Sequence, residues 1–524
     1  MVKRVLALLA GAIGLLLATT LVGVAGPAGA SPASSHVTSA KQGSPSGSLK
    51  VTITGGEWPN LDPALDNEDA LDSQMLNAIY GGLFDYGPKG KIIPDLASGY
   101  TVSNGGMTVD INIRPGVTFS DGTPFTAQDV ASSINRVLLP QNGCICLSNF
   151  SAVKSIAASG PSTVVLTMAR PFAPIIQAFN GTGPNWVVDP TALSSMGTTA
   201  YGQKPVGAGP FMVTSNAANS SLQLTANPRY WRKGFPLLKN LSFLSVGSDQ
   251  SAYSALQAGQ AQMATLIATI PLLKQAMHGA TGNVRVLNFP ATFYEFMSLN
   301  ETVAPFNNIL AREAIYYATD SNALVTHLYG GLYKTVQSPT AQGETFYIPK
   351  VPGYRTYNLA KAKALVKQLG GLSVTMTTTS NTQFWNTEAQ ALQAMWQRAG
   401  IKVNIRLTNL EEVLAQLKSN DWQALDSNWG GADPAIAMPT YFSSKGPFTG
   451  IHDPTLDNLM NQAAVATSKA QRLSLYKQVA QRMNQQAEAP FMYTKTFYSF
   501  ALKSVHGIPT NQGNVPWWQV SVKA

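Results

Sequence analysis

The sequence is short of charged residues, histidines and cysteines, and each shortage argues against a class of protein. Charged residues make up only 12% of the 524 positions, and the formal net charge is +9. No cluster of Lys and Arg alternates with aromatic residues, so we do not expect nucleic acid as a partner. The five histidines are scattered, and no two of them have a metal-ligand spacing. We therefore expect neither a metal centre nor a cofactor.

The familiar motifs of catalysis are also missing. The chain has no G-x-S-x-G elbow that would present a nucleophilic serine, and no H-E-x-x-H pair. The glycine-rich run over residues 204–211 lacks both a following G-K-[ST] and the strand-then-helix context of a dinucleotide site. A triad of residues that lie far apart in sequence stays open, because triads are recognised by geometry. Nothing in the sequence recommends one, and we expect no enzyme activity.

Only two cysteines are present, Cys144 and Cys146, and one residue separates them. An exported protein could form a disulfide here, although so short a bridge strains its geometry. Metal binding would need further soft ligands, which the neighbouring sequence lacks. Two exposed thiols and a strained bridge are both left open.

Residues 1–30 have the form of an export signal. Lys3 and Arg4 precede an uncharged apolar run over residues 5–25, and Ala28-Gly29-Ala30 offers an A-x-A cleavage site. The run is also just long enough to span a bilayer, so an uncleaved anchor is the alternative. No cysteine near this site could carry a lipid. Residues 31–48 are rich in Ser, Pro, Gly and Ala, and we expect them to form a disordered leader.

What the sequence does contain is a well-defined segment over residues 107–137. Apolar and polar residues alternate over residues 109–113, which is the period of a half-buried strand. Two turns follow. Thr126 then stands three residues before Asp129, close to a capping box at the start of an amphipathic helix.

This segment resembles the signature of the family 5 extracellular solute-binding proteins of ABC importers, the group that includes the dipeptide- and oligopeptide-binding proteins. The family pattern is roughly R-x-G-V-x-F-x-D-G-x-P-x-T-A-x-D-V, followed by a helix. The matching residues, in register, are Arg114, Gly116, Val117, Phe119, Asp121, Gly122, Pro124, Thr126, Ala127, Asp129 and Val130. Shorter similarities extend the resemblance over residues 49–507.

The resemblance implies an α/β architecture, namely the two-lobed periplasmic-binding-protein-like fold (type II, three-domain) with mixed sheets and an interlobe hinge. The chain is expected to pass between the lobes near Asn300 and Pro490. The expected ranges are lobe I over residues 49–90 and 205–300, a smaller domain inserted in lobe I over residues 91–204, lobe II over residues 301–489, and a return segment to lobe I over residues 490–524.

Hydrophobic patterns and the same resemblance predict several individual elements. Gly400 is expected to end a helix, as a glycine after the last turn often does. The predicted helices cover residues 72–80, 171–178 and 389–399, and the predicted strands cover residues 49–53, 163–168 and 401–407.

Residues 426–434 resemble the family's W-x-x-D-Y-x-D-P, in which the first Asp pairs with the α-ammonium of a bound peptide. An ammonium in a closed cleft needs such a carboxylate, because burying it alone is costly. Counted from Trp429, the Asp position falls on Ala432, and Asp433 is the carboxylate that remains before Pro434. Asp433 is therefore either a substitute ligand or the cap of the following helix.

Further candidates come from two sources. After an L-D-P at residues 61–63, the family places residues that face the cleft, and these fall on Asn67, Glu68 and Asp69. The alternative for them is a solvated helix start, where acidic residues are favoured. Pockets are largely apolar with a few placed polar groups, so aromatic residues are candidates too, with core packing as the alternative for each and the better explanation for Trp385. The expected ligand-binding residues are Asp433, Trp429, Gly430, Asn67, Glu68, Asp69, Trp58 and Tyr493.

The resemblance implies capture without turnover. A monomeric protein would bind a small solute, a short peptide or a peptide-like compound, in the interlobe cleft by hinge closure. It would then deliver the solute to the permease subunits of an ABC transporter. The alternatives are a binding protein for a nickel chelate, haem or another non-peptide solute, a secreted hydrolase with an activated nucleophile, and an envelope scaffold with a degenerate cleft.

Overall fold

The computed structural model describes residues 44–523 apart from eleven short gaps, and the expected signal and most of the expected leader lie outside the described residues. The gaps are 55–57, 59, 66–69, 87–90, 267–269, 280–281, 343, 380–382, 431–432, 447 and 510–514. The described chain divides into two compact units, which are considered one at a time. Unit 1 is Ala291–Thr496, and unit 2 is the described part of the chain before Ala291 and after Thr496.

The chain passes from one unit to the other inside two strands. These are β12 (Val284–Leu299) and β17 (Phe491–Leu502), with the boundaries after Pro290 and after Thr496. Sequence reasoning expected crossings near Asn300 and Pro490. Both observed crossings lie within extended backbone, so each strand contributes residues to both units.

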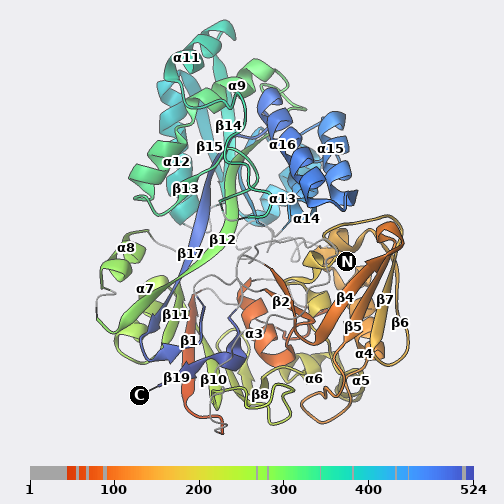
Figure 1. Ribbon diagram of the computed structural model, residues 1–524. Helices are drawn as coiled ribbons and strands as arrows, with labels where there is room; N and C mark the ends of the chain where they lie inside the picture. Colours follow the sequence, from red (N-terminus) through yellow and green to blue (C-terminus); the bar gives the residue numbers. More distant parts are fainter. Residues whose placement is uncertain are drawn as a thin grey trace. The chain divides into compact units, whose positions relative to one another are not determined.

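Unit 2 contains a mixed sheet (Figure 1). Its strands are β1 (Ser48–Thr54), β8 (Phe211–Ala217), β9 (Ser221–Ala226), β10 (Asn240–Val246), β11 (Met263–Leu266) and the C-terminal part of β17. β1 lies between β10 and β11 and pairs with both in parallel, whereas β8, β9 and β17 add to the sheet in antiparallel orientation. The predicted strand over residues 49–53 is confirmed as β1, whose residues Leu49, Val51 and Ile53 are buried.

A second, smaller sheet of unit 2 is antiparallel throughout (Figure 1). In spatial order its strands are β4 (Ala97–Ser103), β5 (Thr108–Ile113), β7 (Thr163–Met168) and β6 (Val153–Ala158). Helix α4 (Ala127–Val137) packs against β6 and β7. The predicted strand over residues 163–168 is confirmed as β7.

The signature segment folds as its pattern predicts. Residues at alternate positions of β5 are buried. The Thr126 hydroxyl accepts a hydrogen bond from the Asp129 amide, and the Asp129 carboxylate accepts one from the Thr126 amide at 2.8 Å. This reciprocal pair is a capping box, and it satisfies two amide donors at the start of α4.

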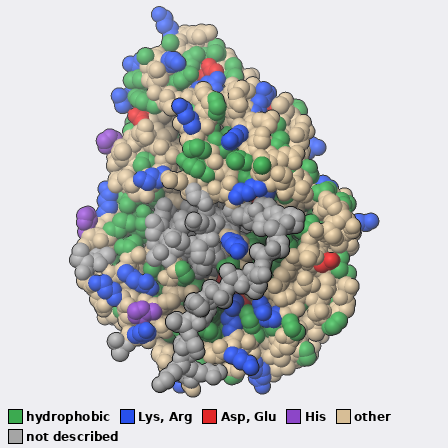
Figure 2. Space-filling model, in the orientation of Figure 1, with side chains coloured by type: hydrophobic (Ala, Val, Ile, Leu, Met, Phe, Trp, Pro, Cys, Tyr) green, Lys and Arg blue, Asp and Glu red, His purple; other side chains and the backbone are tan. Residues whose placement is uncertain are grey.

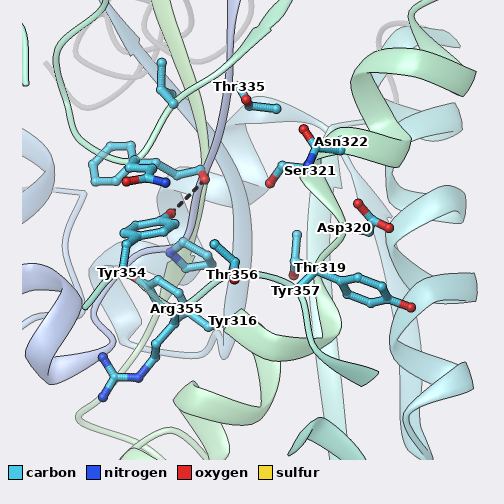
Figure 3. Close-up of a pocket in the computed structure, with 14 residues that line it drawn as sticks. Tyr316, Thr319, Asp320, Ser321, Asn322, Thr335, Tyr354, Arg355, Thr356 and Tyr357 are labelled. Atoms are coloured by element: carbon cyan, nitrogen blue, oxygen red, sulfur yellow. Dashed lines mark hydrogen bonds between the residues drawn. The ribbon is translucent and has the colours of Figure 1, made fainter. Parts of the chain in front are cut away.

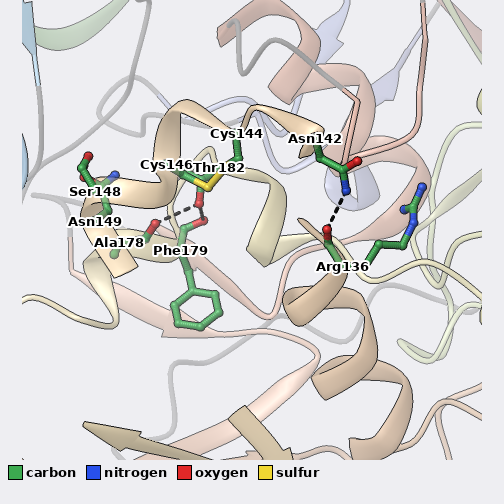
Figure 4. The surroundings of a disulfide bond; sticks show 9 residues. All are labelled: Arg136, Asn142, Cys144, Cys146, Ser148, Asn149, Ala178, Phe179 and Thr182. Carbon is green, nitrogen blue, oxygen red and sulfur yellow. Dashed lines mark hydrogen bonds between the residues drawn. A yellow bond between two sulfur atoms is a disulfide. The ribbon is translucent and has the colours of Figure 1, made fainter. Parts of the chain in front are cut away.

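The two cysteines follow α4 and form a disulfide (Figure 4). Both are buried, in a small apolar cluster with Ala64 and Val137. Of the two interpretations left open by the sequence, the bridge is the one found, and exposed thiols are ruled out. The nearby Thr182 hydroxyl is 2.8 Å from the Ala178 carbonyl oxygen, to which it donates a hydrogen bond.

The predicted helix over residues 171–178 is wrong. This stretch consists of turns and the short 3₁₀ helix η5 (Gln177–Phe179). Pro174 explains the difference, because a proline disfavours the helical conformation at the residue before it. The helix predicted over residues 72–80 is confirmed as α3 (Ala70–Tyr80).

The other elements of unit 2 are short and connect these sheets. They are β2 (Phe84–Tyr86), β3 (Ile92–Pro94), η2 (Asn104–Gly106), η3 (Pro140–Asn142), η4 (Ile145–Phe150), η6 (Gly183–Asn185), α5 (Pro190–Met196), α6 (Thr198–Gln203), α7 (Asp249–Gln257), α8 (Ile270–Gly279), β18 (Val505–His506), η8 (Trp517–Gln519) and β19 (Ser521–Val522).

Unit 1 is a mixed sheet with helices packed on it (Figure 1). In spatial order its strands are β15 (Ile401–Thr408), β14 (Leu372–Thr379), β16 (Ala424–Gly430), β12 and β17, and the short β13 (Lys334–Thr335) also pairs with β17. β14 is parallel to both of its neighbours, and β12 is antiparallel to β16. The strand predicted over residues 401–407 is confirmed as β15. The helix predicted over residues 389–399 exists but begins earlier, as α12 (Gln383–Arg398).

The remaining elements of unit 1 are mostly helices. They are α9 (Ile309–Ala318), α10 (Ser321–Ala323), the π-helix η7 (Leu324–Leu328), α11 (Leu359–Gln368), α13 (Leu410–Ser419), α14 (Pro434–Phe442), α15 (Pro454–Val465) and α16 (Lys469–Gln486). Among the described residues of both units, no helix combines the length and the apolar character needed to cross a membrane.

Candidate functional site

Three acidic side chains are buried together in unit 1. Glu295 on β12 and Glu388 on α12 are 0% exposed, and Asp426 on β16 is 3% exposed. The strand register explains why two of them meet. Glu295 stands opposite Asn428, and Met297 stands opposite Asp426, so Glu295 and Asp426 project from the same face of the sheet. We call Glu295, Glu388 and Asp426 the acid cluster.

One lysine accompanies the acid cluster. The Lys495 ammonium nitrogen on β17 lies 2.5 Å from Glu295 Oε1. The same nitrogen is 4.2 Å from the centre of the Trp385 ring, which is a cation–π distance. Among the described residues, the charges that act on the three carboxyl groups are those of Lys495 and of the cluster itself. One positive charge therefore stands against three acidic groups.

Two tyrosine hydroxyls donate hydrogen bonds to Glu388. The hydroxyls of Tyr329 and Tyr493 both donate to Glu388 Oε2, and they lie 2.9 Å from each other. The ring of Tyr333 stacks on that of Tyr493, with centres 5.4 Å apart. These rings form an aromatic wall beside the acid cluster.

Four oxygens of the acid cluster lack a hydrogen-bond partner among the described residues. They are Glu295 Oε2, Glu388 Oε1 and both carboxylate oxygens of Asp426, whereas Glu295 Oε1 is left out because it lies 2.5 Å from the Lys495 nitrogen. The nearby strand β14 presents one more such atom, the buried Thr378 hydroxyl. A buried acceptor without a donor costs about 1–3 kcal/mol. The site is therefore one that N–H donors would stabilise.

Burial shapes the protonation of the acid cluster. It raises the pKa of Glu295 to about 8, with Lys495 opposing the rise and Glu388 adding to it. Burial also raises the pKa of Asp426 well above its usual range, and the negative charges of Glu388 and Glu295 add to the effect. The pKa of Glu388 is raised by burial against the opposing effects of Lys495 and the two tyrosines. Without an added cation, the acid cluster holds protons near neutral pH.

Asp433 has a different place in the structure. Its carboxylate caps α14 by accepting a hydrogen bond from the Ala435 amide at 3.0 Å. Both of its oxygens also accept hydrogen bonds from the Arg472 guanidinium, and neither side chain is exposed. The helix-cap alternative is therefore the one observed. An incoming ammonium would have to displace an internal ion pair to reach this carboxylate.

The other sequence-based candidates fall into three groups. Tyr493 belongs to the acid cluster's surroundings, and Trp429 and Gly430 lie on β16, the strand that carries Asp426. Trp58 is fully buried in unit 2, where its indole nitrogen donates to Asn216 Oδ1 at 3.1 Å. The candidates Asn67, Glu68 and Asp69, and the position of Ala432, lie outside the described residues.

Sequence reasoning missed Glu295, Glu388 and Lys495. A signal was present for the first of them, because Glu295 is the only charged residue in the largely apolar run over residues 293–299. Lys495 is likewise the only charged residue of strand β17. A charge inside a strand that is otherwise buried needs a partner. Glu388 gave no such signal, because α12 is amphipathic and carries other polar residues.

Unit 1 also has a hollow of about 90 Å³ at the C-terminal end of α9 (Figure 3). Hydroxyl-bearing side chains from several segments surround it, among them Ser321, Thr335 and Tyr357. Its buried polar atoms are already paired: the Tyr354 hydroxyl donates to the Phe491 carbonyl oxygen at 3.1 Å, and Asp320 caps α10. Among the described residues of the whole chain, no group of three or more His, Cys, Asp and Glu is arranged to hold a metal ion.

Comparison with known proteins defines the class of this protein as a solute-binding protein. Residues 91–449 match the model of the bacterial extracellular solute-binding proteins, family 5 (middle region), and the chain belongs to this family. The family serves ABC importers, and its members bind solutes outside the cytoplasm and work with permease components. The resemblance stated from the signature segment is thereby confirmed.

Individual relatives cover most of the chain. It is 28% identical to the glutathione-binding protein GsiB of Shigella dysenteriae over 447 residues, which are 82% of this chain and 85% of that protein. It is 26% identical to GsiB of Pectobacterium atrosepticum over 480 residues, or 88% and 91%.

Solved structures confirm the expected periplasmic-binding-protein fold. HbpA2 of Haemophilus parasuis has a TM-score of 0.79 at 22% identity, covering 91% of this chain and 100% of that one. DppA of Helicobacter pylori, in complex with the peptide STSA, has a TM-score of 0.76 at 22% identity, covering 91% and 98%.

Proposed function

We propose that this protein captures a short peptide or peptide-like solute that carries a cationic nitrogen, and that the acid cluster binds this nitrogen. The observation that carries the proposal is the set of four buried carboxylate oxygens without a hydrogen-bond partner among the described residues. The names of the relatives support the solute class, since GsiB is a glutathione-binding protein and DppA was solved with a peptide.

The chemistry of the acid cluster suits a cation better than other ligands. An ammonium has three N–H donors and no acceptor, so it complements oxygens that can only accept. A buried ion pair is favourable only when both partners are well hydrogen-bonded, and the tyrosine hydroxyls on Glu388 help to meet that condition. A solute carboxylate would instead meet three acidic groups. The acid cluster therefore takes the role for which sequence reasoning considered Asp433.

The proposal also includes several features that the sequence leads us to expect. The protein releases its solute chemically unchanged, acts as a monomer, is exported by its N-terminal segment without a lipid anchor, and has no nucleic-acid partner. On the face shown in Figure 2, Lys and Arg side chains lie scattered among uncharged ones, which agrees with the last point. Mass spectrometry of candidate solutes after incubation tests the first point, because any product would favour the alternative of a secreted hydrolase.

The solute can be identified by native mass spectrometry of gently purified protein. Titration calorimetry with the identified solute, with glutathione and with small peptides then measures affinity, and N-acetylated forms of the same compounds serve as ligands without the cation. We expect acetylation to weaken binding at least about tenfold, since it removes the charge that the acid cluster pairs. Lobe closure, expected from the resemblance, is tested by small-angle scattering with and without solute.

Two variants locate the effect. Asp426→Asn keeps the shape of the side chain and removes one negative charge, and we expect it to weaken binding at least about tenfold. The matched control is Asp421→Asn, which makes the same change at an exposed side chain of unit 1. Equal affinities of both variants and the unmodified protein would show that the cation binds elsewhere.

A further inference from the structure

The acid cluster has more negative charge than one ammonium can balance. Glu295, Glu388 and Asp426 together carry three negative charges when ionised, and Lys495 supplies one positive charge. Within the described part of the chain, Lys495 is the cation whose charge acts on the three groups. The ionised site therefore has an excess of two negative charges.

The number of oxygens without a hydrogen-bond donor also indicates two cationic groups. Four buried oxygens need donors, and they belong to side chains on three different elements, β12, α12 and β16. One ammonium offers three N–H groups that diverge from a single atom, so it cannot reach four oxygens with good geometry. Two cationic nitrogens, or an ammonium and a guanidinium, offer enough donors from two positions. The buried Thr378 hydroxyl adds a further polar atom to the same face of unit 1.

We propose that the solute brings two positive charges to the acid cluster, so that the class is a peptide that begins with a basic residue or a related diamine. This inference rests on the proposed function and narrows its solute class. The α-ammonium and the side-chain cation of such a peptide lie a few carbon atoms apart, as two nitrogens serving neighbouring carboxylates must. The methylene groups between them would pack against the aromatic wall of Tyr333 and Tyr493.

Protons are the competitor of the second cation. If one carboxyl group stayed protonated in the complex, one ammonium would balance the remaining negative charge. The O–H of the protonated carboxyl group would then donate a hydrogen bond to one of the four oxygens. The two cases differ in what happens to these protons. A dication replaces them, whereas a monocation leaves at least one in place.

A matched pair of peptides separates the two cases. Lys-Ala and norleucine-Ala have nearly the same shape, and only Lys-Ala carries a side-chain ammonium. We expect calorimetry on the full mature chain at neutral pH to give Lys-Ala at least about tenfold higher affinity. Repeating the titration in buffers of different ionisation enthalpy should reveal more protons released by Lys-Ala than by norleucine-Ala. The pair 1,5-diaminopentane and pentylamine repeats the comparison without a peptide bond.

Variants connect the preference to the acid cluster. Glu295→Gln and Asp426→Asn should each bring the ratio of the two affinities to within about threefold, since each removes one of the excess charges. Their circular dichroism and thermal unfolding establish that they are folded, and two variants are used so that one that fails to fold does not end the test. Asp421→Asn should keep the full ratio.

Different results would overturn the inference of a dication and the proposed capture of a cationic peptide. Equal affinity for both peptides of the pair, with equal proton release, overturns the inference of a dication and leaves the proposed capture of a cationic peptide standing. If neither pair binds while an acetylated or acidic solute does, the proposed function fails and the inference fails with it. A preference for Lys-Ala that persists in both cluster variants also overturns the inference, because the second charge would then be recognised elsewhere.

Discussion

The guanidinium of Arg472 and the carboxylate of Asp433 form a two-pronged ion pair, in which Arg472 Nη1 lies 2.7 Å from Asp433 Oδ2. Tyr476 adds its hydroxyl at 3.2 Å from Asp433 Oδ1. This acid lies in the segment that sequence comparison associates with ligand binding, yet it is fully engaged inside unit 1. The acceptors without a donor among the described residues lie in the acid cluster, on β12, β16 and α12.

The first prediction concerns this ion pair. Asp433→Asn leaves the Arg472 charge buried without its counter-ion, and such a loss costs about 3–5 kcal/mol. We expect the free energy of unfolding, measured in urea, to fall by about this amount. Asp421→Asn, which breaks an exposed pair with Arg406, should change it by less than about 1 kcal/mol. A similar loss of unfolding free energy in both variants would show that burial of the Asp433–Arg472 pair adds nothing to its contribution.

The second prediction concerns pH. Because the pKa of Glu295 is raised to about 8, the folded protein binds a proton that the unfolded chain gives up above its ordinary pKa of 4.5. The stabilising contribution is complete below that ordinary pKa and is lost as the pH rises through about 8. We therefore expect the solute-free protein to become less stable between pH 5 and pH 8.

The control for the pH prediction is Glu295→Gln, which imitates the protonated side chain. Its loss of stability over the same range should be smaller than that of the unmodified protein by at least about 1 kcal/mol. Bound cationic solute should reverse the trend, because it favours the ionised acid cluster. Parallel curves for the two proteins would mean that Glu295 titrates normally.

The third prediction tests the capping box at the start of α4. Thr126→Ala removes the hydroxyl that accepts from the Asp129 amide, and we expect a loss of about 1 kcal/mol in the free energy of unfolding. Ser132→Ala, at an exposed position within the same helix, serves as the control and should be close to neutral. If both substitutions were neutral, the cap would contribute nothing measurable to stability.

The fourth prediction concerns the Cys144–Cys146 disulfide. A bridge between residues two apart in sequence closes a very small loop, so it restricts the unfolded chain less than a long-range bridge does. We expect reduction to lower the free energy of unfolding by about 1–2 kcal/mol, below the values typical of longer loops. Because both sulfurs are buried, the thiols produced by reduction should react with a labelling reagent only after local opening of the structure. Rapid labelling under native conditions would contradict this.

Local patterns were enough to predict much of the fold. The alternation in β5, the turn residues after it and the Thr126–Asp129 spacing each act within a few residues, and the structure follows them. The failure over residues 171–178 had a local cause too, since Pro174 outweighs the apolar residues around it.

The candidate site depends on contacts that no local pattern contains. Glu295 and Asp426 share a face only because β12 and β16 pair with Phe296 opposite Ser427, across more than a hundred residues of sequence. Asp433 and Arg472 are 39 residues apart, and the sequence around Asp433 gives no sign that its oxygens are paired with an arginine. Long-range register and long-range ion pairs therefore determine which acids already have partners in the structure.

Glu295 and Lys495 connect the two strands in which the chain crosses between the units. Glu295 follows the crossing in β12, Lys495 precedes the crossing in β17, and their ion pair ties the two strands together on the unit 1 side of both crossings. Glu295→Gln removes the charge that Lys495 pairs with. A spectroscopic label beside either crossing, compared between this variant and the unmodified protein, would therefore measure how strongly the ion pair restrains the two strands.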